Sequence, residues 1–203
     1  RFRSGDLDVI GDARPLRSEY YSLLKREENR GKFHVQDGGP WSGTLYLTFN
    51  LTQAKNKAGK PFVDPIKSRW FNTLAFRQAV AYAIDRDRIN NNLFRGLGVI
   101  QNSPISVQSP YFLQQGLKVY DYNPDRAREL LKSAGFRYND QGQLLDWDGN
   151  RVRFTLLTNT NNLVRVAMGS QIKQDLSKIG IQVDFVPLNF NVLIEKTSTS
   201  RDW

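Results

Sequence analysis

AFRQAVAYAIDRDRINNNLFR, residues 75–95, is the stretch that decides the fold class. Apolar side chains recur at helical spacing over 76–84, and Asp85 then offers a carboxylate that can cap a second helix. The apolar positions are Phe76, Ala79, Val80, Ala83 and Ile84 in the first helix and Ile89, Leu93 and Phe94 in the second. The spacing therefore predicts two amphipathic helices in tandem.

A third helix is marked at both ends by its own residues. Asn123 is a capping residue, Pro124 fits the first turn, where its missing N–H costs nothing, and Gly135 ends the helix. Directly after it, two apolar stretches at 144–147 and 152–157 flank Asp148-Gly149, a pair suited to a tight turn. We therefore expect a helix followed by a β-hairpin.

A strand, a helix and a strand then follow one another. The strand at 152–157 leads to a helix that begins at Asn161 or Asn162 and ends at Gly180, and residues 181–187 form the next strand. A crossover of this kind predicts a parallel pair. A last helix is expected near Asn189.

The first half of the chain is less regular. We expect a helix near 18–28 and a half-buried strand at 44–50, where apolar and polar residues alternate. Residues 51–69, rich in lysine and broken by glycine and prolines, indicate an exposed loop, and 101–122 a second irregular stretch. Together these elements predict the α/β class, and the length of residues 1–203 fits one ordinary domain, with two small ones possible.

Composition excludes several classes of protein. With 203 residues, 39% apolar and 12% aromatic, the chain is large enough for a packed core and unlike disordered sequences. It has no cysteine, and no apolar run approaches the ~20 residues that span a bilayer. No methionine precedes Arg1, so we expect the sequence to be a segment of a longer protein.

The net charge of +9 raises the possibility of nucleic-acid binding, a class that uses basic surfaces. The basic residues are interspersed with carboxylates, and no block of five like charges occurs. We therefore expect a solvated mixed surface, with a basic nucleic-acid-binding domain as a minor alternative.

Catalytic and metal-ligating patterns are weak. His34 is the only histidine, it falls in a segment expected to be extended, and no nucleophile motif accompanies it. Asp146 and Asp148 could hold a divalent ion, but aspartate in a turn more often binds the local backbone. We expect no catalytic residue, no metal site and no cofactor, and a small α/β hydrolase or transferase remains the enzymatic alternative.

Polar side chains follow the strand at 152–157. Residues 158–162 are Thr-Asn-Thr-Asn-Asn and lie between a strand end and a helix start, where open α/β sheets place ligands. Capping of the helix explains one of these asparagines. Phe190 follows the next strand in the same way and is either a core contact or a ligand contact.

Five segments, in the correct order, resemble family 5 extracellular solute-binding proteins of ABC transporters, the oligopeptide-, dipeptide- and nickel-binding class. They span nearly the whole chain. They are FRSGDLDV (2–9), TLYLTFN (44–50), FRQAVAYAIDRDRI (76–89), YDYNPDRARELLKSAGF (120–136) and DLSKIGIQVDFVPLNFNVL (175–193).

The resemblance implies a fold, a location and an activity. The fold is a mixed sheet flanked by helices, forming most of the C-terminal lobe of a type II, two-lobed periplasmic-binding protein whose partner lobe lies outside this sequence. Such a protein is not an enzyme. It captures a peptide-like solute between its lobes and delivers it to ABC permease membrane subunits. It is periplasmic or extracellular, and a lipoprotein anchor outside this sequence is expected.

The resemblance also implies a ligand site and one departure. Asn159, Thr160 and Asn161 would line the interlobe cleft, and Phe190 would place a ring against the ligand. The family handles peptides, nickel chelates, sugars and opines, so the ligand itself is not implied. Residues 55–70 are an insertion relative to the usual family pattern.

Overall fold

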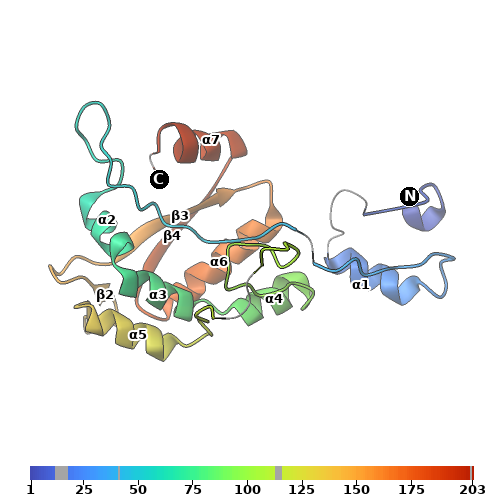
Figure 1. Ribbon diagram of the computed structural model, residues 1–203, viewed down its shortest axis with the longest axis horizontal. Helices are drawn as coiled ribbons and strands as arrows, with labels where there is room; N and C mark the ends of the chain where they lie inside the picture. Colours follow the sequence, from blue (N-terminus) through green and yellow to red (C-terminus); the bar gives the residue numbers. More distant parts are fainter. Residues whose placement is uncertain (12–17, 41, 113–115, 202) are drawn as a thin grey trace. The chain divides into compact units, whose positions relative to one another are not determined.

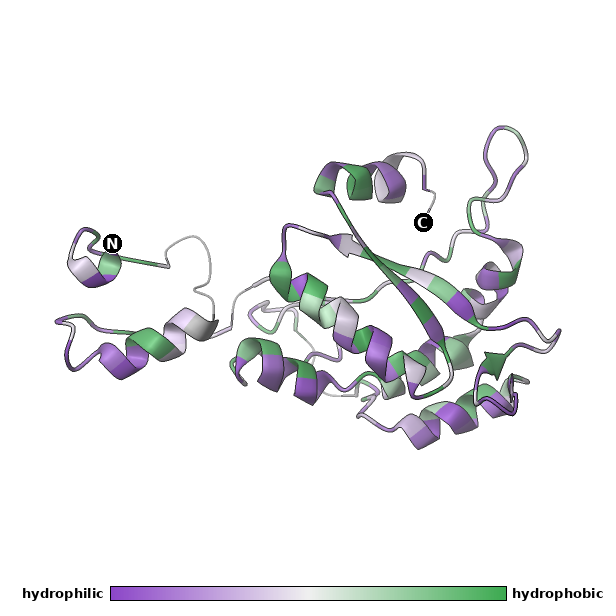
Figure 2. Cartoon of the chain, turned by 180° about the vertical axis from the view of Figure 1, so that it is seen from behind, coloured by the Kyte–Doolittle hydropathy of each residue, from purple (hydrophilic) through white to green (hydrophobic). Residues whose placement is uncertain are grey.

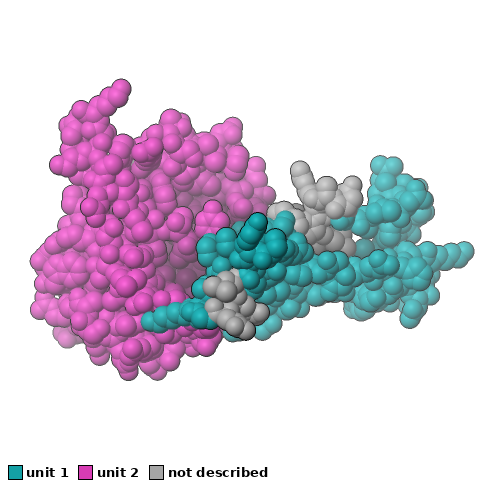
Figure 3. Space-filling view, viewed as in Figure 1, with its two compact units in different colours: residues 1–45, 87–118 teal, residues 46–86, 119–203 magenta. Residues whose placement is uncertain are grey.

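The computed structural model describes residues 1–11, 18–40, 42–112, 116–201 and 203. These residues divide into two compact units, which Figure 3 shows in different colours. Unit 1 comprises residues 1–45 and 87–118, and unit 2 comprises residues 46–86 and 119–203. Every strand assigned in the described residues belongs to unit 2, so both two-stranded sheets lie in that unit.

The elements follow one another as shown in Figure 1. The helices are η1 (Phe2–Ser4), α1 (Ser18–Glu27), α2 (Pro65–Asn72), α3 (Leu74–Ala83), α4 (Arg86–Phe94), α5 (Pro124–Ser133), α6 (Leu163–Ser177), α7 (Phe190–Ile194) and the π-helical turn η2 (Glu195–Thr199). The strands are β1 (Arg137–Tyr138), β2 (Leu144–Leu145), β3 (Arg153–Asn159) and β4 (Gln182–Leu188). The predicted helices at 18–28, at 76–94, after Asn123, after Asn162 and near Asn189 are confirmed.

Unit 1 is held by contacts around α1 and α4. The rings of Phe2 and Phe33 lie 5.2 Å apart, and Arg3 forms an ion pair with Glu27 at 2.7 Å. Asn90 fastens the chain after α4 by donating to the Gly98 carbonyl at 3.0 Å and accepting from its N–H at 2.9 Å. The unit therefore relies on polar and surface contacts more than on a large core.

In unit 2, α3 and α5 pack against each other. The α3 face predicted from its spacing is buried, and Phe76 has no exposed surface. Helix α5 begins as expected: the Asn123 side chain accepts from the Arg126 N–H at 2.8 Å, and Pro124 takes the first turn. Figure 2 shows green, apolar residues along one side of α5 and purple, polar ones along the other.

The parallel pair predicted from the strand–helix–strand order is confirmed. Strands β3 and β4 are parallel, in a register that pairs Arg153 with Gln182 and Thr158 with Pro187. Helix α6 packs on both strands. A Cβ atom at Gly169 would lie 2.3 Å from the Phe185 ring, so glycine is what allows α6 to approach β4 so closely.

The predicted hairpin is present only in part. Strand β2 is shorter than expected and pairs antiparallel with β1, which the sequence did not suggest, while a single bridge joins Leu145 to Arg151. The turn itself is as predicted, with Gly149 at a φ of 86° and its N–H donating to the Asp146 carbonyl at 3.1 Å. The Asp148-Gly149 turn forms as its residues predict, whereas β2 pairs with β1, a strand outside the predicted hairpin.

An aromatic cluster forms the core of unit 2. The Phe76 ring lies 6.3 Å from Phe71, 6.3 Å from Phe154 and 5.7 Å from Phe136, and Phe49 lies 5.2 Å from Phe71. Such tilted, edge-to-face and stacked pairs add about 0.5–1.5 kcal/mol each beyond area burial. Phenylalanines from α2, α3, β3 and two loops thus share one core.

The strand predicted at 44–50 is wrong, because no strand is assigned there. The alternation did identify the inward residue Phe49, but Leu45 and Tyr46 remain 40% and 79% exposed. A strand exists only when a neighbouring backbone accepts and donates its hydrogen bonds. None of the described residues provides that neighbour for 44–50.

Two other expectations about local structure are also wrong. The loop expected over 51–69 ends at Asp64, whose carboxylate caps α2 by accepting from Ile66 and Lys67, and Trp70 of that helix is buried. The segment around His34, expected to be a strand, has no strand assignment. The His34 side chain is 92% exposed and lies 3.7 Å from Glu28.

Asp146 is a fully buried carboxylate that joins α2 to the β2–β3 turn. Its Oδ2 accepts from the Trp70 indole N–H at 2.9 Å, and its Oδ1 accepts from the backbone N–H groups of Asp148 at 3.0 Å and Asn150 at 2.8 Å. Burial by itself raises the pKa of Asp146, but these hydrogen bonds outweigh burial and hold the pKa below its ordinary value. Asp146 is therefore ionised at neutral pH.

Changing this contact should cost stability. Trp70→Phe removes one donor to a buried carboxylate, which should lower the free energy of unfolding by about 2 kcal/mol. In Asp146→Asn the amide NH₂ would face either the Trp70 indole N–H or the backbone N–H groups of Asp148 and Asn150, all of which are donors. We therefore expect the free energy of unfolding to fall by about 3 kcal/mol. Asp148→Asn, at an exposed ion pair with Arg69, is the control and should cost less than ~1 kcal/mol. Urea denaturation measures all three.

The same contact predicts a pH dependence. A carboxylate whose folded pKa lies below the unfolded value of about 3.9 stabilises the fold above that value, and this stabilisation is lost as pH falls through the folded pKa. The wild-type free energy of unfolding should therefore fall below about pH 4, more steeply than that of Asp146→Asn. Equal slopes for the two proteins would contradict this account.

Whether residues 1–203 fold as a single lobe remains a prediction. Helix α4 continues from Arg86, in unit 2, into unit 1, so unfolding of one unit should disturb the other. We expect one calorimetric transition with equal calorimetric and van't Hoff enthalpies. Two resolved transitions would show that the units are separate domains.

Candidate ligand-binding site

Two loops leave the same end of the β3–β4 pair. Strand β3 ends at Asn159, which is the register partner of Leu188 at the end of β4. The Thr160 N–H then donates to the Leu188 carbonyl at 2.8 Å and ties the two strand ends together. The polar loop after β3 and helix α7 after β4 therefore start side by side.

Asn159 lies mostly inside the protein. It is 8% exposed, and its Oδ1 accepts from the Arg165 guanidinium at 3.2 Å. The carbonyl oxygen of this amide is thus already used within unit 2. Asn159 therefore helps to position Arg165, and little of its own side chain reaches the surface.

Thr160 and Asn161 are exposed and hydrogen-bonded to each other. The Thr160 hydroxyl donates to the Asn161 Oδ1 at 2.9 Å. The next residue, Asn162, is the one that caps α6, because its Oδ1 accepts from the Arg165 N–H at 3.0 Å. Capping therefore accounts for Asn162 and leaves Asn161 without that role.

Phe190 is the first residue of α7 and is 48% exposed, so it is not a core residue of this chain. The Asn189 side chain caps α7 by accepting from the Asn191 N–H at 3.0 Å, and α7 packs against β3. Val192 and Ile194 on the same helix are also 46% and 42% exposed. The helix thus leaves three apolar side chains partly exposed.

Arg165 is a residue of this region that the sequence reasoning missed. Its exposed side chain sits in the first turn of α6, where the helix dipole already favours negative charge. Its position three residues after the capping asparagine is the sequence signal that could have identified it. Arg165 thus places a positive charge next to Asn159, at the start of the polar loop.

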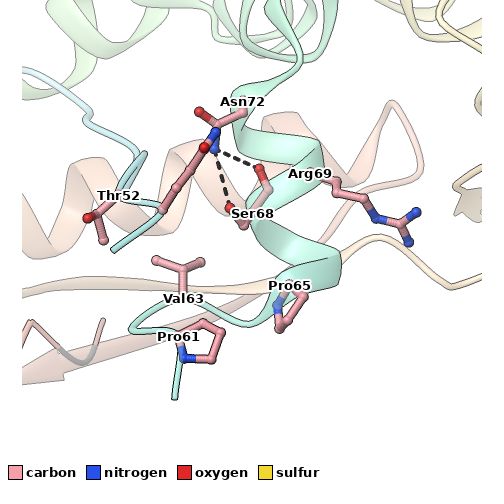
Figure 4. A pocket seen from close by; sticks show the side chains of 8 residues that line it. Thr52, Pro61, Val63, Pro65, Ser68, Arg69 and Asn72 are labelled. Carbon is pink, nitrogen blue, oxygen red and sulfur yellow. Dashed lines mark hydrogen bonds between the residues drawn. The ribbon is translucent and has the colours of Figure 1, made fainter. Parts of the chain in front are cut away.

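Two surface hollows in the described part of unit 2 are lined by residues other than the predicted ligand residues. One, of about 340 Å³, lies between the 52–63 loop and α2 and is shown in Figure 4. It is lined by Thr52, Gln53, Pro61, Val63, Pro65, Ser68, Arg69 and Asn72. Of the predicted ligand residues, Thr160, Asn161 and Phe190 are exposed and Asn159 is buried.

Metal ligation finds no support in the described part of the chain, where no group of three or more histidine or acidic side chains could hold an ion. The Asp146-x-Asp148 pair is explained by the turn, since Asp146 binds backbone N–H groups and Asp148 pairs with Arg69 at 2.7 Å. The interpretation of this pair as turn chemistry is confirmed.

Comparison with known proteins identifies the family. The model of the bacterial extracellular solute-binding proteins, family 5 Middle, matches residues 1–203. The chain belongs to this family. Its fold class is therefore α/β, that of the type II periplasmic-binding proteins, as the sequence predicted.

Relatives in the family share about a quarter to a third of the residues. A probable ABC transporter-binding protein of Deinococcus radiodurans is 26% identical over 91% of this chain and 33% of its own length. The oligopeptide-binding protein AppA of Bacillus subtilis is 32% identical over 64% of this chain and 24% of its own. The chain thus spans about a quarter to a third of the relatives that it matches.

Solved structures agree. The structure of Bacillus subtilis AppA in complex with a nonapeptide matches with a TM-score of 0.62 and 30% identity over 66% of this chain and 27% of that one. An oligopeptide-binding protein OppA matches with a TM-score of 0.63 and 32% identity over 69% and 22%. The family is extracellular or periplasmic, and in the described residues no helix is long and apolar enough to cross a membrane.

The different roles of Asn162, which caps α6, and Asn161, which is exposed, can be tested. Asn162→Ala removes the cap of α6 and should lower the free energy of unfolding by about 1 kcal/mol. Asn161→Ala removes an exposed amide next to it and should change stability by less than ~0.5 kcal/mol. Thermal denaturation followed by circular dichroism compares the two. A larger loss for Asn161→Ala would mean that the roles of the two asparagines are reversed.

Proposed function

We propose that this chain is part of a solute-binding protein that captures a peptide-like solute between two lobes and delivers it to an ABC permease. Support comes from the family match and from the similarity to AppA, whose structure holds a nonapeptide. In this proposal the protein is periplasmic or extracellular, and a lipoprotein anchor would hold it at the membrane.

The mechanism needs no chemical step. A two-lobed protein exists in open and closed forms, and a ligand that contacts both lobes binds the closed form more tightly. The free energy of those contacts shifts the population toward the closed form. The permease then needs only to distinguish closed from open.

Asn159, Thr160, Asn161 and Phe190 form the wall contributed by this chain. The observation that carries the assignment is the Thr160–Leu188 hydrogen bond, which places the polar loop and the start of α7 at one end of the β3–β4 pair. Uncharged amides and hydroxyls can bond the backbone of an extended peptide whatever its side chains. A half-exposed phenylalanine beside them can pack against one of those side chains.

Arg165 adds a charge to this wall. Its guanidinium donates to Asn159 and lies in the first turn of α6, so its other N–H groups can donate to a ligand carboxylate in the same region. A peptide supplies both a polar backbone and a carboxylate at its end. These features together favour a peptide over an uncharged sugar.

The decisive residue is Phe190. In the full-length protein, Phe190→Ala should weaken oligopeptide binding by about 1–3 kcal/mol, the range for an aromatic contact at a buried interface. Stability should change little, because the ring is 48% exposed in this chain. Isothermal titration calorimetry with a mixed oligopeptide library measures the first effect and thermal denaturation the second.

Leu74→Ala is the matched control, since Leu74 is an apolar residue, 59% exposed, at the start of a different helix of unit 2. It should leave oligopeptide affinity unchanged. A lower melting temperature for Phe190→Ala with unchanged affinity would show that Phe190 is a packing residue. Absence of oligopeptide binding by the wild-type protein would exclude the peptide-like ligand.

A further inference from the structure

A second hollow of unit 2, of about 700 Å³, lies between the second half of α5, the β1–β2 turn and the end of α6. Its volume is within the range of small-molecule sites, roughly 300–1,000 Å³. It is lined by Arg128, Lys132, Phe136, Arg137, Tyr138, Gly142 and Lys178. Four of these seven residues are cationic and none is acidic, so the hollow is a basic one.

Carboxylates balance only half of this charge. Arg128 forms an ion pair with Asp125 at 2.7 Å, and Lys178 forms one with Asp175 at 2.9 Å. Lys132 and Arg137 have no carboxylate partner among the residues that the structure describes. The hollow therefore keeps an excess of two positive charges.

The cations are held in place by neutral groups. Arg137 donates to the Trp147 carbonyl at 3.1 Å, and Arg128 donates to the Lys178 carbonyl at 2.6 Å. The Lys132 ammonium lies 5.9 Å from the centre of the Tyr138 ring. Groups that are positioned before a ligand arrives lose less conformational entropy on binding it.

The backbone beneath the hollow is also fixed. The Leu144 N–H donates to the Gly180 carbonyl at 2.9 Å, and the Tyr138 hydroxyl donates to the Ile179 carbonyl at 3.2 Å. Gly180 has a φ of 77°, and a Cβ atom there would lie 2.6 Å from the Gly142 carbonyl oxygen. A glycine is thus needed to bring the β1–β2 turn against the end of α6.

This hollow is separate from the proposed peptide wall. Gly180 precedes β4, whereas Thr160 and Phe190 follow the ends of β3 and β4. Strands of seven residues separate the two places, which is about 20 Å at ~3.3 Å per residue. A ligand at one place does not occupy the other.

We infer that this hollow is a binding site for a phosphate group. Guanidinium groups match phosphate oxygens in a bidentate way, and lysine adds a point charge, so two arginines and two lysines suit a dianion. The excess of two charges equals that of a phosphate monoester at neutral pH. The group could belong to free phosphate or to the headgroup of an anionic phospholipid, and the two sources share this chemistry.

The first test titrates ¹⁵N-labelled full chain with inorganic phosphate in low-salt buffer. We expect saturable shifts of the Tyr138, Gly142 and Gly180 amide signals. The double variant Lys132→Gln, Arg137→Gln should weaken the apparent affinity at least tenfold. The matched control Lys55→Gln, Lys57→Gln removes the same charge from an exposed loop and should leave the affinity unchanged.

The second test distinguishes the sources by sedimentation with vesicles that contain phosphatidic acid, whose headgroup is a phosphate monoester, with phosphatidylcholine vesicles as reference. Sedimentation that the double variant abolishes and inorganic phosphate competes away would assign a lipid headgroup. Saturable phosphate binding without sedimentation would assign a free phosphate. Both results support the site.

Four outcomes would overturn the inference. The first three are an absence of saturable shifts, shifts scattered over both units, and equal weakening by the double variant and the control. The fourth is retention of duplex DNA that phosphate does not compete away, which would point to a diffuse polyanion-binding surface. If the double variant does not fold, Lys132→Gln alone serves, because the side-chain contact of Lys132 among the described residues is one with the Tyr138 ring at 5.9 Å.

Discussion

The buried carboxylate of Asp146 is the contact on which the rest of unit 2 depends. It accepts hydrogen bonds from α2 and from the β2–β3 turn, so it fixes the register between two segments 76 residues apart in sequence. All the donors identified above are neutral, so among the described residues the negative charge is stabilised by oriented N–H dipoles. The arrangement joins α2, which carries Phe71 of the aromatic core, to the turn that leads into β3, the strand that ends at the proposed ligand wall.

Helices with complete end signals were predictable from sequence because those signals are local. Asn123-Pro124 identified α5, and Asp64-Pro65 carries the same signal for α2, which was missed because the surrounding glycine and prolines suggested a loop. The strand expected at 44–50 failed for the opposite reason. Alternation describes one face of a chain, whereas a strand needs a partner that the alternation does not specify.

The candidate site shows the same division. The position of the polar loop and of Phe190 at neighbouring strand ends followed from the order of the elements and the parallel pairing. The distribution of tasks among the three asparagines did not, because Asn159 is engaged with Arg165, Asn162 caps α6 and Asn161 does neither. Only the backbone geometry of the helix start separates these roles.

Pro187 in β4 has a consequence for how this sheet can grow. The Gln182 N–H and the Leu188 carbonyl both point toward β3. Backbone groups of successive residues in a strand point to opposite sides, so the nitrogen of Pro187, next to Leu188, points away from β3. The missing N–H therefore costs nothing in the pairing with β3. A chain approaching the outer edge of β4 would find one donor absent there, and this edge is thereby protected against intermolecular strand addition and aggregation.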